Sequence, residues 1–489
     1  MDYQSTRGGA MALKSSTAII QGIAPDGGLF IPKGLPVITA TDIKEHQNDS
    51  YLDWAKLILG AVFSDFNKER LDACIEAAYG TGFDDEAVAP LKKIKDDLYV
   101  LELWHGPTAA FKDMALQLLP HLMSMSLDLE GIEETALILV ATSGDTGKAA
   151  LDGFCDVPKT AVCVYYPKDG VAKLQELQMT TQVGDNVHVL AVEGNFDDAQ
   201  TGVKRIFGDD EIREKLLKKQ YTLSSANSIN FGRLAPQIVY YFTAYADLLR
   251  RGEIKNGEAV DYVVPTGNFG NILAGWYAKA MGLPIGKLIC ASNKNNVLYD
   301  FYDTGCYDVN RDFHQTLSPS MDILVSSNLE RLLYEISGRD SQMVKDLMEG
   351  LKKDGRYAIR PELHSIIHEG FTFGWADDTM TRETILKVWE KHHYLSDTHT
   401  AVALSVNEKI DGDRKRIVLS TASPYKFASD VLSALGEDSG KDSFQDVQRL
   451  SGLTGTKVPE TISRLKDSQV LHTKDCEVKG MDDALLDLL

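Results

Sequence analysis

Between residues 135 and 291, short apolar runs alternate with longer stretches in which apolar residues recur at helical spacing. The apolar runs occupy residues 137–141, 161–166, 187–192, 260–264 and 287–291. Alternating strands and helices are typical of βα units, which build a parallel sheet covered by helices. This pattern predicts an α/β fold.

The segments that flank this region are organised differently. Residues 1–97 mix helical patterns with Gly and Pro turns, which indicates a separate N-terminal module. Beyond Ser318 the pattern is mostly helical, with one more strand at residues 417–419, and residues 328–354 are expected to form a surface helix or a helix pair. The polar stretch at residues 436–442 predicts a linker to a C-terminal tail.

Composition narrows the partners that such a chain can have. With 51 Lys and Arg against 71 Asp and Glu, the net charge is −20, which disfavours nucleic acid and anionic membranes as partners. The six cysteines have neither C-x-x-C nor metal-ligand spacing, so we expect free thiols, a reducing cytoplasmic setting and no metal. We expect no secretory signal, and no apolar run approaches the roughly 20 residues of a membrane span.

One lysine stands in an unusual place. The run His105-Gly-Pro-Thr-Ala-Ala-Phe-Lys112 follows an apolar segment at residues 98–103 and opens a helical pattern at residues 114–123. The positive field at the start of a helix lowers the pKa of an amine, and Schiff-base chemistry needs the neutral amine. The alternative is a solvated surface lysine, against which the apolar residues 109–111 argue. Lys112 is therefore a candidate catalytic residue.

A second run has the pattern of an anion-binding loop. Residues 259–265 predict a buried strand, residues 272–281 a helix, and between them lies Thr266-Gly-Asn-Phe-Gly-Asn271. Glycines let backbone N–H groups converge on a phosphate, and the following helix adds its positive end. An ordinary strand-to-helix turn is the alternative, because a lone pair of glycines is a weak signal. A phosphate cradle together with the lysine indicates pyridoxal phosphate.

Two more strands are followed by hydroxyl-rich loops. Behind residues 137–141 comes Thr142-Ser-Gly-Asp-Thr-Gly147, whose hydroxyls and N–H groups suit a carboxylate or phosphate oxygen. The alternative is an N-capping turn in which Ser143 or Asp145 is the cap. The strand at residues 417–419 is followed by Thr421, whose hydroxyl makes this the fourth segment of the sequence with a candidate site residue.

Further motifs occur in order along nearly the whole chain: Ser5-Thr-Arg-Gly8, Gln21-Gly-Ile-Ala-Pro-Asp-Gly-Gly-Leu-Phe30, Ser228-Ile-Asn-Phe-Gly-Arg233, Ser318-Pro-Ser-Met-Asp-Ile323, Asp397-Thr-His-Thr-Ala-Val402 and Thr421-Ala-Ser-Pro-Tyr-Lys-Phe427. Together with the runs above, they resemble threonine synthase, a family of pyridoxal-phosphate enzymes of fold type II. The resemblance is strongest to the longer branch of that family, which has an extended N-terminal region.

The resemblance implies two α/β domains with the cofactor between them. We place the N-terminal module at residues 1–97 and the large cofactor-binding domain at residues 98–128 and 225–435. The smaller domain with its substrate loop would span residues 129–224, and a C-terminal tail would span residues 436–489.

The resemblance also implies a reaction, the conversion of O-phospho-L-homoserine and water to L-threonine and phosphate. Lys112 would hold the cofactor as a Schiff base and act as a mobile acid and base, and Thr421 would face the pyridine nitrogen. The cofactor phosphate would lie on Gly267, Asn268, Phe269, Gly270 and Asn271. The substrate carboxylate would lie on Ser143, Gly144, Asp145, Thr146 and Gly147.

For the substrate phosphate we expect Arg233 and Lys148, because bidentate guanidinium recognition fits a dianion. Arg233 would stand at the start of a long helix at residues 231–249, and a structural ion pair is the alternative for each residue. His105 and His399 are expected to be structural, because the lysine already provides proton transfer.

Two other functions stay open at this point. One is a phospho-lyase, similar to threonine synthase, that releases a 2-oxo acid instead of adding water. The other is a non-catalytic amino-acid sensor that kept the fold. For the enzyme implied by the resemblance we expect a small-molecule substrate, O-phospho-L-homoserine, no nucleic-acid or membrane partner, and a monomer or homodimer.

Overall fold

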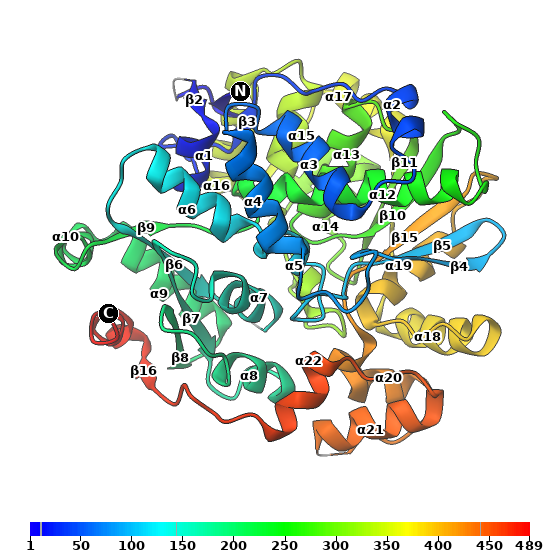
Figure 1. Ribbon diagram of the computed structural model, residues 1–489. Coiled ribbons are helices and arrows are strands. Elements are labelled where there is room, and N and C mark those ends of the chain that lie inside the picture. Colours follow the sequence, from blue (N-terminus) through cyan, green and yellow to red (C-terminus); the bar gives the residue numbers. More distant parts are fainter. Residues whose placement is uncertain (10–11, 143, 441) are drawn as a thin grey trace.

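The computed structural model describes residues 1–9, 12–142, 144–440 and 442–489. Its largest sheet has the strand order β14-β11-β10-β15-β5-β4 (Figure 1). Neighbouring strands are parallel except at one edge, where β4 pairs antiparallel with β5. The strands span Leu91–Lys95 (β4), Leu98–Glu102 (β5), Val260–Pro265 (β10), Ile285–Ser292 (β11), Phe371–Trp375 (β14) and Arg416–Ser420 (β15).

A second, fully parallel sheet has the order β16-β8-β7-β6-β9. Its strands span Thr135–Ala141 (β6), Thr160–Pro167 (β7), Val187–Glu193 (β8), Tyr221–Ser224 (β9) and Asp475–Glu477 (β16). Its helices are Asp145–Phe154 (α7), Lys173–Thr180 (α8), Phe196–Gly208 (α9) and Asp210–Lys218 (α10). The two sheets confirm the predicted α/β class, and every strand predicted from the sequence ends within two residues of its expected bounds.

The N-terminal segment is packed into the core of the large sheet. It forms a small antiparallel sheet and four helices: Asp2–Ser5 (β1), Leu13–Lys14 (β2), Phe30–Pro32 (β3), Ser15–Gln21 (α1), Ala40–Glu45 (α2), Tyr51–Val62 (α3) and Lys68–Tyr79 (α4). Helix α1 packs on α6, and α3 packs on α12. Their apolar side chains belong to the same buried cluster as those of the large sheet.

The large domain also contains further helices and a separate two-stranded antiparallel sheet, β12-β13. They span Asp113–Leu116 (α5), Leu119–Leu129 (α6), Phe231–Leu234 (α11), Pro236–Arg250 (α12), Gly270–Ala280 (α13), Val297–Thr304 (α14), Leu329–Ile336 (α15), Ser341–Asp354 (α16), Pro361–Gly370 (α17), Asp378–His392 (α18), Thr398–Glu408 (α19), Cys306–Asp308 (β12) and Arg356–Ala358 (β13). A 3-10 turn, η1, spans Pro319–Met321.

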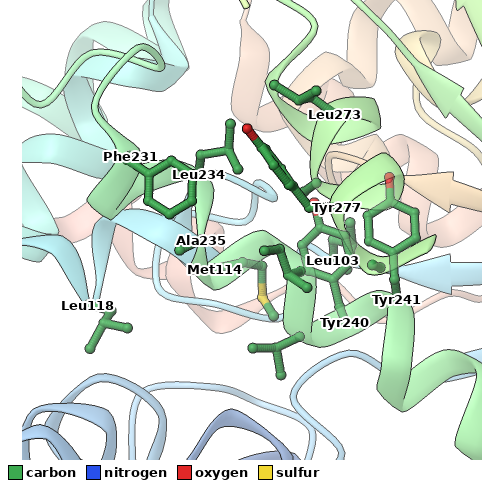
Figure 2. Close-up of a cluster of buried hydrophobic side chains, with 14 of the residues drawn as sticks. Leu103, Met114, Leu118, Phe231, Leu234, Ala235, Tyr240, Tyr241, Leu273 and Tyr277 are labelled. Carbon is green, nitrogen blue, oxygen red and sulfur yellow. The ribbon is translucent and has the colours of Figure 1, made fainter. Parts of the chain in front are cut away.

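A dense apolar cluster lies beneath the segment that carries the predicted catalytic lysine. Leu103 precedes that segment, Met114 follows it, and both are fully buried. Figure 2 shows them packed among side chains of α11, α12 and α13, including Phe231, Tyr240 and Tyr277. Close packing of this kind holds the backbone on both sides of the lysine in one position.

Three expectations about secondary structure need correction. The helix expected at residues 114–123 is two helices, α5 and α6, and the helix expected at residues 231–249 is divided into α11 and α12. Proline occupies the first turn of both second helices, Pro120 in α6 and Pro236 in α12, where it starts a helix more easily than it continues one. The mostly helical region beyond Ser318 also contains β13 and the edge strand β14. Residues 328–354 form the expected helix pair, α15 and α16.

The C-terminal segment runs from the large domain to the small sheet, as the red ribbon in Figure 1 shows. It contains Pro424–Phe427 (η2), Ala428–Ala434 (α20), Ser443–Thr454 (α21), Glu460–Ser463 (α22), Arg464–Asp467 (η3), Val478–Gly480 (η4) and Met481–Leu486 (α23). Strand β16 then pairs with β8. The segment expected as a tail therefore adds a strand to the small domain, while the exact domain boundaries stay a prediction.

All six cysteines are free thiols, and two of them, Cys163 and Cys290, are buried. In the described ranges, no helix combines the length and apolar character that crossing a bilayer requires. The same ranges contain no group of His, Cys, Asp and Glu side chains arranged to hold a metal ion.

Candidate active site

The predicted site residues follow the carboxyl ends of strands in both sheets. Lys112 comes after β5, Gly267 after β10, Thr421 after β15 and Asp145 after β6. In open parallel sheets, this edge is where ligands bind. The contacts below show which of these side chains come together.

Lys112 is buried, with 7% of its side chain exposed. Its Nζ lies 3.4 Å from Asp145 Oδ2 and donates a hydrogen bond of 3.1 Å to Ser320 Oγ. Burial, with the nearby Lys426 and Arg233 cations, lowers the pKa of the amine, and the Asp145 carboxylate opposes that shift. The expected direction of the shift is confirmed. Its cause differs, because α5 has only four residues and burial replaces the helix field as the largest contribution.

Asp145 stands at the start of α7 and accepts hydrogen bonds on both carboxylate oxygens. Oδ1 accepts from Lys426 Nζ at 2.6 Å and from Gln175 Nε2 at 3.1 Å. Oδ2 faces Lys112 and accepts from Ser320 Oγ at 3.4 Å. Burial alone would raise the pKa of this carboxyl, but the two lysine ammonium groups hold it well below its usual range.

Two functional candidates in this cluster, Ser320 and Lys426, were missed by the sequence reasoning. Both lie in motifs of the resemblance, Ser320 in η1 and Lys426 in η2. The usable signal for Lys426 was a lysine placed between two aromatic residues, Tyr425 and Phe427, directly behind a strand. Its side chain is fully buried, which a lysine tolerates only with a charged partner.

The loop between β10 and α13 has the geometry of an anion cradle. Phe269 has left-handed backbone angles, with φ of 62°, and Gly270 begins the helix. Within the described part of the chain, none of the backbone N–H groups from Gly267 to Asn271 donates a hydrogen bond to a protein acceptor. A Cβ atom at Gly267 would lie 2.9 Å from the Ser320 carbonyl oxygen, so only glycine fits there. These N–H groups suit a phosphate.

Asn271 holds the far end of this loop. Its Oδ1 accepts hydrogen bonds from Tyr240 Oη at 2.6 Å and Tyr241 Oη at 3.0 Å. Its Nδ2 is buried and has no hydrogen-bond acceptor among the described residues. Asn268, by contrast, is exposed, and its carbonyl oxygen accepts from Asn328 Nδ2 at 3.0 Å. A donor buried without an acceptor is a further indication of an anion site.

Thr421 is buried and linked through its backbone to the segment of Lys112. Its carbonyl oxygen accepts a hydrogen bond of 2.8 Å from the Phe111 amide, and its amide donates to Thr400 Oγ1 at 3.3 Å. No hydrogen bond joins its own hydroxyl to another described residue, so this hydroxyl is available to a ligand.

The loop between β6 and α7 is organised around one threonine. Thr142 Oγ1 accepts hydrogen bonds of 3.0 Å from the amides of Gly144 and Gly147. Those two N–H groups are thus satisfied within the loop. Among its described residues, the amides of Asp145 and Thr146 remain as candidate donors to a substrate carboxylate. The predicted contribution of Ser143 lies outside the described residues.

The two basic residues expected at the substrate phosphate have different surroundings. Arg233 is 6% exposed and donates to the Ala226 carbonyl oxygen at 2.9 Å, and within the described ranges it forms no ion pair. Burial lowers the pKa of its guanidinium to about 10. Lys148 is paired with Asp152 at 3.1 Å and also donates to Gln182. Arg233 is therefore the stronger candidate, and Lys148 has the structural ion pair that was its alternative.

The two histidines have structural partners. His105 lies between Asp84, at 2.5 Å, and Glu102, at 3.0 Å. Burial would lower the pKa of this imidazole, but the two carboxylates outweigh burial and raise it to about 9. His399 is placed between Asp397, at 3.0 Å from Nδ1, and the Ser320 amide, which donates to Nε2 at 3.2 Å. Through that amide, His399 helps to hold Ser320 beside Lys112.

The chain matches three family profiles. The profile described as Threonine synthase N terminus covers residues 2–79, Pyridoxal-phosphate dependent enzyme covers residues 86–420, and Threonine synthase, C-terminal covers residues 400–474. The chain is 39% identical to the threonine synthase of Pseudomonas aeruginosa, over 89% of this chain and 90% of that protein. It is 41% identical to human Threonine synthase-like 1 over 86% of this chain, but spans only 58% of that protein's length.

Solved structures show the same similarity. The crystal structure of PLP-bound threonine synthase from Brucella melitensis superposes with a TM-score of 0.90 at 39% identity, covering 100% of this chain and 99% of that chain. Threonine synthase from yeast superposes with a TM-score of 0.89 at 35% identity, covering 100% and 98%.

The buried lysine between two α/β sheets and the profile over residues 86–420 define a pyridoxal-phosphate-dependent enzyme of fold type II. Within that class, the similarity to threonine synthases extends over the N-terminal and C-terminal segments as well. The chain belongs to the threonine synthase family.

Proposed function

We propose that this chain converts O-phospho-L-homoserine and water to L-threonine and inorganic phosphate with pyridoxal 5'-phosphate as its cofactor. The observation that carries the proposal is a buried lysine of lowered pKa that is joined through Ser320 to a loop whose N–H groups have no acceptor among the described residues. The lysine fits the aldehyde of the cofactor, and the loop fits its phosphate.

The residues of the chain have separate roles in binding the cofactor. Lys112 would hold it covalently, and the amides from Gly267 to Asn271 would hold its phosphate, together with the buried Nδ2 of Asn271. The Thr421 hydroxyl would face the pyridine nitrogen. When bound, the cofactor supplies an electron sink for carbanions at the substrate's carbon atoms.

Lys112 would also move the protons of the reaction. Released from the cofactor, the Lys112 amine would take protons from Cα and then Cβ. After the phosphate has left, one of these protons would go to Cγ and the other to the phosphate. Water adds its oxygen to Cβ and a proton to Cα, which completes threonine. Arg233 would bind the leaving phosphate as a dianion, and the amides of Asp145 and Thr146 would hold the substrate carboxylate.

A product analysis tests this proposal. Holoenzyme incubated with O-phospho-L-homoserine should release phosphate and threonine in equal amounts. One alternative stays open, a phospho-lyase, for which the product is 2-oxobutanoate and ammonia instead of threonine. Release of no phosphate at all, under conditions in which the cofactor is bound, would leave the sensor as the remaining function.

The setting of the enzyme is a second part of the proposal. Six free thiols, two of them buried, support a reducing compartment such as the cytoplasm. We propose a monomer or homodimer that acts on a small molecule. Sedimentation of the purified holoenzyme distinguishes the two states, and a larger assembly would contradict both.

A further inference from the structure

Two buried lysines converge on one carboxylate in the candidate site. Lys426 Nζ lies 2.6 Å from Asp145 Oδ1, and Lys112 Nζ lies 3.4 Å from Asp145 Oδ2. The exposed fractions of the three side chains are 0% for Lys426, 7% for Lys112 and 5% for Asp145. The shorter contact therefore belongs to the lysine that has no role in the reaction described above.

Lys426 also connects three separate segments of the site. It belongs to η2, five residues after Thr421, and its Nζ donates a hydrogen bond of 2.9 Å to the Thr108 carbonyl oxygen in the segment that leads to Lys112. Its partner Asp145 begins α7, which belongs to the small sheet domain. The ion pair thus joins the two domains at the reacting lysine.

The Asp145 carboxylate favours a charged Lys112, whereas the reaction needs a neutral one. A lone buried carboxylate beside Lys112 would hold the amine as an ammonium ion, because each charge would compensate the other in a low-dielectric site. The reaction needs the opposite, an amine that gives up its proton. A second cation on the same carboxylate weakens its attraction for the proton of Lys112.

We propose that Lys426 is a positioning residue of the reaction: it is the counter-ion of Asp145, fixes that carboxylate between the domains, and leaves Lys112 able to exist as a neutral amine. The inference rests on the proposed function of Lys112. It assigns to Lys426 no contact with the substrate and no proton transfer.

The other charged and titratable groups around the cluster are compatible with this role. Arg233 adds a further positive charge near Lys112, and His399 adds one near Asp145 when it is protonated. Asp113 is fully buried and accepts hydrogen bonds from the Thr108 amide and hydroxyl, and burial raises its pKa to about 7. The remaining partners of Asp145, Gln175 and Ser320, carry no charge.

The test is a spectroscopic pH titration of the holoenzyme. The visible absorbance of bound pyridoxal phosphate reports protonation of the nitrogen that Lys112 contributes. Lys426→Met removes a cation and should raise the midpoint of that titration by about one pH unit. Asp145→Asn removes an anion and should lower it by about the same amount. Lys426→Arg, which keeps the charge, should stay close to the unchanged enzyme.

A double variant protects the test against loss of folding. Lys426→Met leaves a buried carboxylate with a weaker partner, whereas Asp145→Asn with Lys426→Met leaves no charge of this pair behind. If the single variant does not fold, the step from Asp145→Asn to the double variant measures the same effect and should again raise the midpoint. Lys287→Met is the matched control, since this lysine likewise donates to backbone carbonyl oxygens, those of His368 and Glu369, but lies outside the site.

The outcomes separate this inference from the proposed function. A purely structural Lys426 would cost stability in Lys426→Met and leave the midpoint unchanged, and that result overturns the inference, as does a lowered midpoint. If the protein without any substitution shows no visible absorbance of bound pyridoxal phosphate, the proposed function is contradicted instead. In that case the pH dependence of Lys112 acetylation by acetic anhydride, followed by peptide mass mapping, still decides the inference, with the same expected signs.

Discussion

The two strand-to-helix loops at the site share a sequence pattern but have opposite electrostatic characters. The loop from Gly267 to Asn271 contains no carboxylate, and its N–H groups find no acceptor in the described part of the chain. The loop from Thr142 to Gly147 satisfies two of its own amides with Thr142 and places the Asp145 carboxylate at the start of α7. The first loop is arranged to receive an anion, and the second supplies one.

This difference teaches what a helix N-terminus can do in an active site. Its positive end stabilises either a bound anion or a carboxylate of the protein itself. At α13 the position is left to a phosphate, whereas the first turn of α7 carries Asp145, whose carboxylate faces the two lysines. Glycine and hydroxyl residues alone do not distinguish these cases, whereas the presence of an aspartate in the loop does.

The largest expected effect concerns Lys112, the proposed catalytic residue. Lys112→Ala should reduce turnover by about 10³-fold or more, because acid and base catalysis and covalent attachment are lost together. Cofactor should still bind through its phosphate. Turnover is measured as phosphate release, and cofactor binding by equilibrium dialysis. Retention of a tenth of the activity would show that another group does the proton transfer.

The next effect tests whether Arg233 binds the phosphate of the substrate, at a place separate from the two loops. Arg233→Ala should reduce kcat/KM by about 10-fold to 100-fold, the cost of losing a charge-assisted contact, and Arg233→Lys should recover part of it. Cofactor affinity should be unchanged. Lys148→Met is the matched comparison, expected to affect stability more than KM, because Lys148 is paired with Asp152. Loss of cofactor in Arg233→Ala, with unaltered affinity for phosphohomoserine, would move Arg233 to the cofactor site.

A smaller effect is expected in the anion-accepting loop itself. Gly267→Ala introduces a Cβ atom 2.9 Å from a backbone oxygen, so the loop must shift and cofactor affinity should fall by about 10-fold. Gly60→Ala in α3 is the control, since no atom lies within 4 Å of its added methyl group and alanine favours a helix. Equal cofactor affinity in both variants would contradict the cradle.

The smallest effect concerns the neutral hydrogen bond that we expect between the Thr421 hydroxyl and the pyridine nitrogen of the cofactor. Thr421→Ala should reduce kcat by about two-fold to ten-fold, since one neutral hydrogen bond contributes about 0.5–1.5 kcal/mol. The visible band of bound cofactor should persist. Thr421→Asp should increase side transamination, measured as pyridoxamine phosphate, because a carboxylate would hold the pyridine nitrogen protonated. Unaltered kinetics in Thr421→Ala would argue against the contact.

Local sequence patterns made the central strands of the two sheets predictable. Strands such as β6 and β7 are largely buried on both faces, so each appears in the sequence as a continuous apolar run with clear ends. Strand β14 was missed because it is a short edge strand, contains a glycine and follows α17 directly. The divided helices show that a proline within a continuous apolar pattern predicts the start of a new helix, even where the apolar pattern continues across it.

The site was predictable where it depends on chain-local geometry, and not where it depends on tertiary contacts. Lys112 and the glycine loop stand in recognisable local sequences. The contact between Lys426 and Asp145 joins residues 281 positions apart, in two sheet domains. Ser320 is likewise 208 positions from Lys112 and 79 positions from His399. A single sequence does not state which buried charges face each other, and the fold supplies that information.

Borohydride reduction of the holoenzyme, followed by peptide mass mapping, tests the central claim most directly. The account predicts a pyridoxyl adduct on Lys112, because its amine contacts Asp145 and also Ser320, which packs against Gly267 of the anion-accepting loop. The competing lysine is Lys426, which is more deeply buried and shares the same carboxylate. An adduct on Lys426, or on any other lysine, would contradict the account.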